Sequence, residues 1–571
     1  MTHSAFTDTL CDVLRRHAES DPERLAYTWL SDRGSPERSV SFGELARRAT
    51  ALAHTLRERA EPGERVLLLC PNGIDFMIGF FGSLLAGLIA VPMMLPRRQA
   101  ARDASVSIVA NCAPRIALAP AALIAGERGE LTSRVAVSGL HWVAIDEPPP
   151  APRAPLPVLQ PNDIAFLQYT SGSTAAPKGV MVSHANLMAN LVMIEAAFGN
   201  SRESTYVSWV PLYHDMGLIT NALQAAYLGA HCVLMAPVAF IQRPAIWLRA
   251  ISDYGAEVAG GPNFTFDLCV ERARPDQLEG IDLSRWKVAF NGAEPVRAQT
   301  LRRFAEAFAA YGYAANTMYP AFGMAEGTVL ITAGNRGRDP ITRTISRGGL
   351  LRDRAVAATG AADALEVVAC GHALPGENVA IVDPEDRLRC GPDEVGEIWV
   401  RGPNIAHGYW QAPEASEAVF AATIADDSSN QDWLRTGDLG FLDAAGELFI
   451  TGRRKDMIII RGANHYPQDI EDTVQNCHPG LRRYGGAAFA VSDAQGPERL
   501  VVVQEIERTY RNQIEPAELI RQIRTAIVND HEIVPRAIEL LRPGSLPKTT
   551  SGKIQRSLSR ELWLAGALDR L

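Results

Sequence analysis

Apolar runs of strand length alternate with helical patterns in the part of the chain that precedes about Val367. The runs are Arg65–Leu69, Ile164–Leu167, Tyr206–Val210, Cys232–Met235 and Val288–Phe290. Helical patterns such as Leu187, Leu191 and Ile194 lie between them. Strands that are apolar throughout are buried on both faces, as in parallel sheets that are covered by helices on each side. We therefore predict an α/β fold for this part of the chain.

The composition is that of a globular protein. The 571 residues are 47% hydrophobic and 21% charged, and they suffice for roughly three or four domain-sized units. The formal net charge is -9, whereas capture of DNA or RNA needs a concentrated basic face. The eight cysteines are scattered singly, without a Cys-x-x-Cys pair for zinc. We expect no nucleic-acid partner and a reducing, cytoplasmic environment.

One segment, Phe76 to Leu95, is uncharged and has the length of a membrane span. It contains Gly87 and Pro92, which divide it into a helix that ends near Gly87 and a buried strand, Leu88–Met93. We therefore predict no membrane span here. The first residues also lack the basic and apolar regions of an export signal.

The pattern changes from about Val367 onward. Closely spaced strands such as Glu397–Val400 predict a β-rich subdomain at about 367–452. Beyond the charged junction Arg453–Asp456, further strands and a helix that begins at Pro516 predict a small α+β unit. We expect an N-terminal domain of residues 1–452 and a C-terminal domain of residues 453–571.

The segment Tyr169–Gly179 reads Tyr-Thr-Ser-Gly-Ser-Thr-Ala-Ala-Pro-Lys-Gly and directly follows an apolar strand. Its glycines allow close backbone approach, its hydroxyls donate hydrogen bonds, and amides in a turn bind anions. A Walker A loop would instead continue into a helix after its lysine, whereas Gly179–Val182 is typical of a strand. The segment predicts a polyphosphate-binding loop, with a flexible surface loop as the alternative. Its candidate nucleotide-binding residues are Thr170, Ser171, Gly172, Ser173, Thr174 and Lys178.

Four further motifs accompany this loop. They are Pro211-Leu-Tyr-His-Asp-Met-Gly-Leu218, Gly260-Gly-Pro-Asn-Phe264, Asn291-Gly-Ala-Glu-Pro295 and Arg461-Gly-Ala-Asn-His-Tyr-Pro-Gln-Asp-Ile-Glu471. In number and order they resemble the adenylate-forming superfamily of acyl-CoA synthetases, luciferases and peptide-synthetase adenylation domains, and most closely its fatty acyl-AMP ligases. The resemblance extends over nearly the whole chain, to Lys553. It implies a large N-terminal domain of two α/β subdomains plus the β-rich subdomain, and a small, mobile α+β C-terminal domain.

The resemblance also implies a reaction. ATP would activate a fatty acid to an acyl-adenylate with release of pyrophosphate, and the acyl group would then pass to the phosphopantetheine thiol of an acyl carrier protein. Because a carboxylate must approach the α-phosphate, cations are needed where the two anions meet. Lys553 matches the lysine that relatives insert there, Glu326 matches their magnesium ligand, and His214 matches a residue beside the acyl carboxylate. For His214 we expect a gating or orienting role rather than general-base catalysis, because the carboxylate is already ionised at neutral pH.

Further residues match the family's nucleotide site. Phe322 matches the aromatic ring that stacks on adenine, Asp438 the acceptor of both ribose hydroxyls, and Arg453 a residue that assists at the ribose. Ala325 stands where the family usually has threonine. The remaining candidates are Asn291, Gly292, Ala293 and Glu294 along the base, Gly323 and Met324 beside Phe322, and Lys455 at the hinge between the domains. A core aromatic is the alternative for Phe322, and a charged linker is the alternative for the hinge.

Apolar residues predominate in Tyr213–Leu228 and Gly260–Leu268, where we expect the acyl site. No charge there is evidently dedicated to an amino acid's ammonium group, which favours a fatty acid, and Gly260 and Gly261 could leave room for an alkyl chain. The region between Leu330 and Val367 resembles the insertion that marks fatty acyl-AMP ligases, at roughly Ile341–Leu365, and the resemblance implies that it restrains the motion that transfer to CoA needs. The resemblance to the fatty acyl-AMP ligases implies ATP and Mg²⁺ as cofactors and a carrier protein on a separate chain as partner. The alternatives are an acyl-CoA synthetase and an inactive nucleotide- or lipid-binding module.

Overall fold

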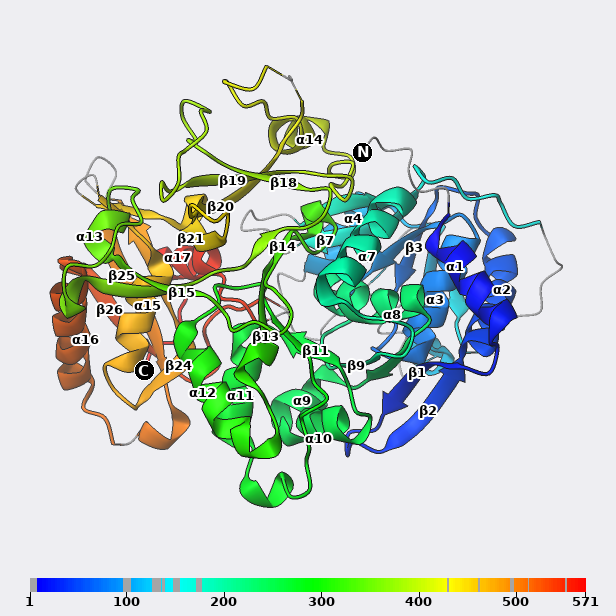
Figure 1. Cartoon of the computed structure of the whole chain (residues 1–571), viewed down its shortest axis with the longest axis horizontal. Helices are drawn as coiled ribbons and strands as arrows, with labels where there is room; N and C mark the ends of the chain where they lie inside the picture. Colours follow the sequence, from blue (N-terminus) through cyan, green and yellow to red (C-terminus); the bar gives the residue numbers. More distant parts are fainter. Residues whose placement is uncertain are drawn as a thin grey trace.

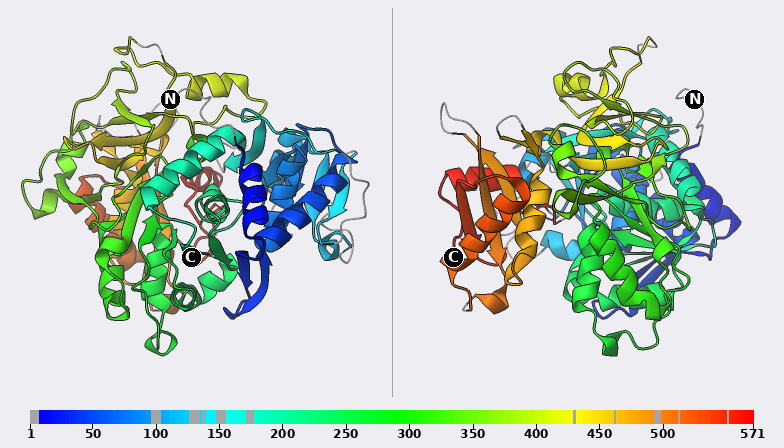
Figure 2. Two further views of the ribbon diagram at one scale, coloured as in Figure 1. Left: turned by 45° about the vertical axis from the view of Figure 1, so that its right-hand side comes forward. Right: turned by 60° about the vertical axis from the view of Figure 1, so that its left-hand side comes forward.

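The structure is a computed structural model, and it describes residues 8–95, 104–125, 135, 139–146, 155–170, 177–428, 431–460, 463–492, 498–511, 513–549 and 552–571. Ser171, Gly172, Ser173 and Thr174 of the predicted phosphate loop lie outside the described residues. The N-terminal elements form the body of the molecule, and the C-terminal elements, orange to red, form a smaller lobe at its side (Figures 1 and 2).

One large sheet has the strand order β6-β5-β3-β4-β7-β8 within the described residues. Its neighbouring strands run parallel except for β8, which pairs with β7 in the antiparallel direction. The strands are β3 (Arg65–Leu68), β4 (Ile89–Pro92), β5 (Ile116–Ala119), β6 (His141–Ala144), β7 (Ile164–Thr170) and β8 (Lys178–Ser183). Every residue of β4 and β5 is buried, as expected for a sheet covered on both faces.

The second large sheet has the order β17-β14-β13-β12-β11-β9-β10-β1-β2 within the described residues. The strands from β13 to β1 in this order run parallel, and the strands at both edges are antiparallel. Their bounds are β1 (Leu25–Leu30), β2 (Pro36–Ser41), β9 (Thr205–Ser208), β10 (His231–Leu234), β11 (Val258–Gly261), β12 (Val288–Asn291), β13 (Met318–Phe322), β14 (Thr332–Ala333) and β17 (His372–Ala373). The predicted α/β architecture is confirmed.

Helices connect and cover these strands. They are α1 (Leu10–Ser20), α2 (Phe42–Arg57), α3 (Ile74–Leu85), α4 (Ala104–Cys112), α5 (Ala121–Ala125), α7 (His184–Phe198), α8 (Gln224–Leu228), α9 (Pro237–Gln242), α10 (Ala245–Asp253), α11 (Asn263–Arg272), α12 (Ala298–Phe308), α13 (Arg347–Leu350) and α14 (Pro413–Phe420). Helix α3 contacts β3 and β4 of one sheet and β1 of the other. The uncharged segment Phe76 to Leu95 therefore contains most of the buried helix α3 and all of strand β4, as predicted. Among the described helices, none has the length and apolar character to cross a membrane.

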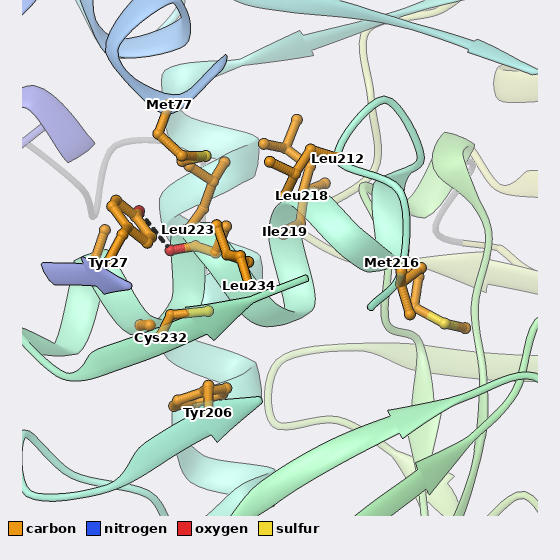
Figure 3. Close-up of a cluster of buried hydrophobic side chains, with 14 of the residues drawn as sticks. Tyr27, Met77, Tyr206, Leu212, Met216, Leu218, Ile219, Leu223, Cys232 and Leu234 are labelled. Carbon is orange, nitrogen blue, oxygen red and sulfur yellow. Dashed lines mark hydrogen bonds between the residues drawn. The ribbon is translucent and has the colours of Figure 1, made fainter. Parts of the chain in front are cut away.

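A π-helix, Met216–Leu223, follows β9. Its Leu218, Ile219 and Leu223 belong to a buried cluster that includes Met77 (Figure 3), and the Tyr27 hydroxyl donates a 2.9 Å hydrogen bond to the Ala222 carbonyl. Met216 lies apart from the other labelled side chains (Figure 3) and lines the large cleft described below. π-Helices often occur at functional sites.

Antiparallel strands form the next part of the chain. β15 (Thr342–Ser346) pairs with β16 (Ala364–Val368), and a separate sheet has the order β18-β19-β20-β21. The latter strands are β18 (Asn378–Val382), β19 (Gly396–Arg401), β20 (Leu434–Leu442) and β21 (Leu448–Arg453).

The C-terminal elements enclose a hydrophobic core of their own. They are β22 (Ile458–Ile460), β23 (Ala463–His465), α15 (Pro467–Asn476), β24 (Leu481–Val491), β25 (Arg499–Ile506), α16 (Pro516–His531), β26 (Ala537–Leu541) and α17 (Arg556–Leu564). Leu500 and Val502 of β25 pack in a cluster with residues of α15 and α16, whereas Val501 and Val503 pack in a cluster that α17 borders. Alternate residues of a strand point to opposite faces, so helices cover both faces of this small sheet.

Candidate active site

A cleft of about 2380 Å³ lies between the N-terminal strand ends and the C-terminal elements. Thr170 ends β7 and Phe322 ends β13, and both residues line the cleft. Ligands of open α/β sheets bind at the carboxyl ends of the strands. Most of the candidate residues from the sequence line this cleft: Thr170, Lys178, His214, Gly292, Ala293, Glu294, Phe322, Gly323, Met324, Ala325, Glu326, Asp438, Arg453, Lys455 and Lys553. Asn291 is fully buried, and its side-chain Nδ2 donates a 3.1 Å hydrogen bond to Oδ1 of Asn263.

Lys553 lines the cleft and is hydrogen-bonded through its backbone to Thr549. The Lys553 amide donates to Oγ1 of Thr549 at 3.0 Å, and its carbonyl accepts from the Thr549 amide at 2.7 Å. Gly552 has a φ of +87°, a backbone conformation that favours glycine. Burial lowers the pKa of Lys553 and the Arg453 cation adds to this, while Asp215 and Glu294 act in the opposite direction. The Lys553 ammonium group forms no ion pair or hydrogen bond with any described residue.

His214 and Asp215 form a close pair at the start of the π-helix. Nδ1 of His214 lies 2.6 Å from Oδ1 of Asp215, which also accepts a 2.7 Å hydrogen bond from the Met216 amide. Burial opposes ionisation of Asp215, but His214 and Lys553 lower its pKa on balance. The segment is fixed to β7 because Nε2 of Gln168 donates to the Tyr213 carbonyl at 3.0 Å.

Glu326 is buried and is held by a residue that the sequence did not single out, Tyr409. The Tyr409 hydroxyl donates a 2.8 Å hydrogen bond to Oε1 of Glu326, and Nζ of Lys178 lies 4.6 Å from the centre of the Tyr409 ring. The Trp410 amide donates to the Gly179 carbonyl at 2.7 Å, which fixes this segment to β8. Burial raises the pKa of Glu326, and the hydrogen bond from Tyr409 opposes that shift.

Glu326 fits a Mg²⁺ ion that arrives with a nucleotide. Mg²⁺ usually binds through one or two carboxylates and completes its shell with phosphate oxygens and water. The described residues contain no group of three or more His, Cys, Asp or Glu that could hold a metal alone. Glu326 lines the cleft, and Tyr409 occupies only one of its carboxylate oxygens. The second oxygen can therefore bind such an ion.

Asp438 and Arg453 face each other across β20 and β21. Nε of Arg453 donates to Oδ1 of Asp438 at 2.7 Å, and the Asp438 side chain is only 7% exposed. Lys455 follows in a short 3-10 helix, Arg454–Asp456, where burial and then Arg453 lower its pKa. Phe322 lines the cleft and also packs against Ile331 and Ile398, so it is in part a core residue.

Apolar residues line another part of the cleft. Tyr213, Phe264 and Leu268 come from the segments predicted for the acyl site, whereas Trp209 and two residues of α9, Val238 and Ile241, were not predicted. Both oxygens of Asp267 are occupied, because Oδ2 accepts a hydrogen bond from Thr300 and Oδ1 accepts one from Arg303, at 2.8 Å each. Asp215 is paired with His214 through Oδ1.

The expectation that Gly260 and Gly261 leave room for an alkyl chain is wrong. A Cβ on Gly260 would lie 2.2 Å from the Phe290 carbonyl oxygen, and one on Gly261 would lie 2.6 Å from Oγ1 of Thr265. These glycines allow neighbouring parts of the protein to approach closely.

The predicted insertion forms β15, α13 and the start of β16. Its Ile345 and Leu350 pack in a cluster with Phe441 of β20 and Tyr466 of the C-terminal part. Oδ1 and Oδ2 of Asp353 accept hydrogen bonds from Nδ2 of Asn464 at 3.0 and 3.1 Å. The insertion therefore contacts both the β18–β21 sheet and the C-terminal elements.

Two protein families match the chain. Residues 14–410 match the family described as AMP-binding enzyme, and residues 455–570 match the family described as Disco-interacting protein 2-like, AMP domain. The medium-chain-fatty-acid–acyl-carrier-protein ligase JamA of Moorena producens is 40% identical over 98% of this chain and 96% of the relative. The 4-hydroxyphenylalkanoate adenylyltransferase of Mycobacterium tuberculosis is 37% identical over 99% of this chain and 93% of the relative.

Solved structures agree with these relatives. The crystal structure of the fatty acyl-adenylate ligase from L. pneumophila in complex with acyl adenylate and pyrophosphate has a TM-score of 0.75 and 38% identity, and the match covers 98% of this chain and 97% of that chain. The fold is thus that of the adenylate-forming enzymes, and the chain belongs to the AMP-binding enzyme family. Within this family it belongs to the fatty acyl-AMP ligases.

Proposed function

We propose that this protein uses ATP to convert a fatty acid to an acyl-adenylate, releases pyrophosphate, and passes the acyl group to the phosphopantetheine thiol of a separate acyl carrier protein. The observation that carries the proposal is the position of Lys553, which lines the cleft while its ammonium group forms no ion pair with any described residue. An isolated cation in such a place is suited to charge that the reactants bring.

The nucleotide would occupy the side of the cleft that contains Phe322 and Asp438. We assign Phe322 and the Asn291–Glu294 segment to adenine, and Asp438 with Arg453 to the ribose. Asp438 is suited to this because a carboxylate accepts hydrogen bonds on both oxygens and Arg453 occupies only one of them. Lys178, Thr170 and the loop that follows Thr170 would contact the phosphates.

The acid carboxylate would enter beside His214 and Lys553. One of its oxygens attacks the α-phosphorus, the bond from that phosphorus to the bridging oxygen breaks, and pyrophosphate leaves. Lys553 neutralises the charge that accumulates on the α-phosphate oxygens. The carboxylate is ionised at neutral pH, so His214, which is held by Asp215, would orient it rather than remove a proton.

Magnesium is part of the proposal. Glu326 would hold the ion with Tyr409 as its fixed hydrogen-bond donor. When bound, Mg²⁺ supplies positive charge that neutralises the phosphates of ATP.

The nature of the acid follows from the apolar part of the cleft. Trp209, Phe264 and Leu268 offer an apolar surface, both oxygens of Asp267 accept hydrogen bonds from protein groups, and Asp215 is paired with His214. A relative with 40% identity is named for medium-chain fatty acids, which supports an acid of that class. The relative named for 4-hydroxyphenylalkanoate makes aryl acids a necessary comparison in any substrate screen.

The acceptor follows from the insertion and from the relative named as an acyl-carrier-protein ligase. Contacts of the insertion with Asn464 and Tyr466 would restrain the motion that transfer to CoA needs. All eight cysteines are free thiols, and we place the reaction in the reducing cytoplasm.

A mass-spectrometric acid screen tests the proposal. The enzyme is incubated with ATP, Mg²⁺ and a panel of alkyl, aryl and amino acids, and acyl-adenylates are detected directly. Alkyl adenylates as the main products support the proposal, and their absence contradicts it. Supplying CoA or a phosphopantetheinylated carrier protein in parallel then separates the ligase from an acyl-CoA synthetase.

A further inference from the structure

A tyrosine of the C-terminal part, Tyr484, reaches into the N-terminal part beside the cleft. Its hydroxyl donates a hydrogen bond to Oδ2 of Asp267 and accepts one of 3.1 Å from Nδ2 of Asn263. Both partners belong to α11 and are buried. Thr300 and Arg303 also donate to Asp267, so the acceptor of Tyr484 is itself firmly held.

The backbone of β24 is shaped to direct this side chain. Leu481 pairs with Ile506 and the next registered pair is Gly486 with Gln504, so the intervening residues of β24 form a bulge. Tyr484 lies in this bulge with a φ of 53°, which bulky residues rarely adopt. Its amide donates to Oε1 of Gln475 at 2.9 Å. Bulges near active sites redirect side chains, and strained residues persist where the surroundings hold them.

A second set of contacts surrounds the ring of Tyr484. The Arg297 guanidinium of the N-terminal part lies 5.0 Å from the ring centre and pairs with Asp472 of α15 at 2.6 Å. Nε2 of Gln475 donates to the same Asp472 oxygen at 2.7 Å. Tyr484, Gln475, Asp472 and Arg297 thus form a closed group of contacts across the two parts of the chain.

These contacts adjoin the catalytic elements on both sides. Oδ1 of Asn263 accepts from Asn291, which begins the loop assigned to adenine. Gly552, which precedes Lys553, lies beside the same helix, because a Cβ on Gly552 would be 3.5 Å from the Phe264 ring. Tyr484 and Gly552, the residue before Lys553, therefore both lie beside α11.

We propose that Tyr484 is a positioning residue: its hydrogen bonds to Asp267 and Asn263 hold the C-terminal part in the arrangement that places Lys553 in the cleft. This inference rests on the proposed function, because it assigns Tyr484 to the adenylation step. Tyr484 acts through Lys553 and does not itself contact the reacting atoms.

The test compares Tyr484→Phe with wild type in two measurements. The first is ATP–pyrophosphate exchange with dodecanoic acid, and the second is hydrogen–deuterium exchange of peptides that cover residues 545–556. The substitution keeps the ring over Arg297 and removes the hydroxyl. A hydrogen bond to a charged acceptor typically changes an equilibrium by about 10-fold or more, so we expect pyrophosphate exchange to fall about 10-fold. Deuterium uptake should rise in residues 545–556 and stay unchanged in β25 and β26.

Tyr510→Phe is the matched control, because Tyr510 belongs to the same part of the chain and its hydroxyl hydrogen-bonds to no described residue. It should behave as wild type in both measurements. Unchanged uptake in residues 545–556 of Tyr484→Phe would overturn the inference, and so would increased uptake throughout β25 and β26, which indicates general destabilisation. If wild type showed no acid-dependent pyrophosphate exchange, that result would contradict the proposed function. The comparison of deuterium uptake between wild type and Tyr484→Phe would still test whether Tyr484 holds the Lys553 segment in place.

Discussion

The hydroxyl of Tyr409 donates a 2.8 Å hydrogen bond to Oε1 of the buried Glu326. Burial raises the pKa of this carboxyl, and the hydrogen bond from Tyr409 favours its ionised form. Tyr409 also lies beneath the ammonium group of Lys178. One aromatic residue thus links the proposed metal ligand to the strand that follows the predicted phosphate loop.

Replacing Tyr409 by phenylalanine should weaken adenylation. Without the donor, the pKa of Glu326 rises further, so more of the carboxyl is protonated at a given pH and the remaining activity should increase with pH. We expect about a 10-fold fall in pyrophosphate exchange near neutral pH, since a buried charge loses a hydrogen bond, and a higher Mg²⁺ requirement. Tyr227→Phe is the control, because the Tyr227 hydroxyl donates to Glu195 at 3.0 Å and neither residue lines the cleft. Equal Mg²⁺ dependence in the two variants would contradict the assignment of Glu326.

Asp438→Asn should raise the KM for ATP. An amide replaces a carboxylate that would accept hydrogen bonds from the ribose, and Arg453 loses its ionic partner. Such charged hydrogen bonds contribute about 10-fold in affinity or more. Steady-state kinetics with varied ATP measure the change, and the KM for the acid should stay close to that of wild type. Asp393→Asn breaks a similar pair, with Arg343 at 2.6 Å, and should leave the KM for ATP unaltered.

Asn464→Ala should increase the formation of acyl-CoA. The substitution removes both hydrogen bonds between the insertion and β23. If these contacts restrain the C-terminal part, the rate of thioester formation with CoA should rise about 3-fold, as expected for the loss of a modest hydrogen-bond contribution. Gln522→Ala, on the exposed side of α16, serves as control. A CoA rate that is unchanged in Asn464→Ala would show that this contact does not select the acceptor.

Asp469→Asn should stabilise the protein most at high pH. Burial raises the pKa of Asp469 to about 7, well above its value in an unfolded chain. Between these two values the native state binds more protons than the unfolded state, so this group lowers the stability as the pH rises toward 7. The variant should therefore exceed wild type in melting temperature by more at pH 8 than at pH 5. Asp386→Asn, at an exposed position, should show no such pH dependence, and an equal gain for Asp469→Asn at both pH values would contradict the assignment.

Patterns of neighbouring residues predicted much of the fold. The strand at Glu397–Val400 and the helix from Pro516 were placed correctly, as was the division of Phe76 to Leu95 into helix and strand. Each depends on local periodicity or on glycine and proline, which act within a few residues.

Prediction of the site depended more on the resemblance of its motifs to a known family. The residues that hold the site residues in place could not be predicted. Tyr409 is far from Glu326 in sequence, and no spacing connects them. Tyr484 is directed by a bulge whose register is fixed by the partner strand β25. Gly260 was expected to leave room for an alkyl chain because the sequence around it does not show that Phe290 fills the space beside it.

The most direct test of the account is mass-spectrometric detection of acyl-adenylate by wild type and by Lys553→Ala, with ATP, Mg²⁺ and a medium-chain fatty acid. Removing one well-placed electrostatic stabiliser costs about 10²–10³ in rate, so the variant should form adenylate at least about 100-fold more slowly with an unchanged melting temperature. Lys287→Ala, on the exposed surface of the body, should match wild type. The account predicts abundant acyl-adenylate from wild type and almost none from Lys553→Ala, and equal amounts from both would contradict it.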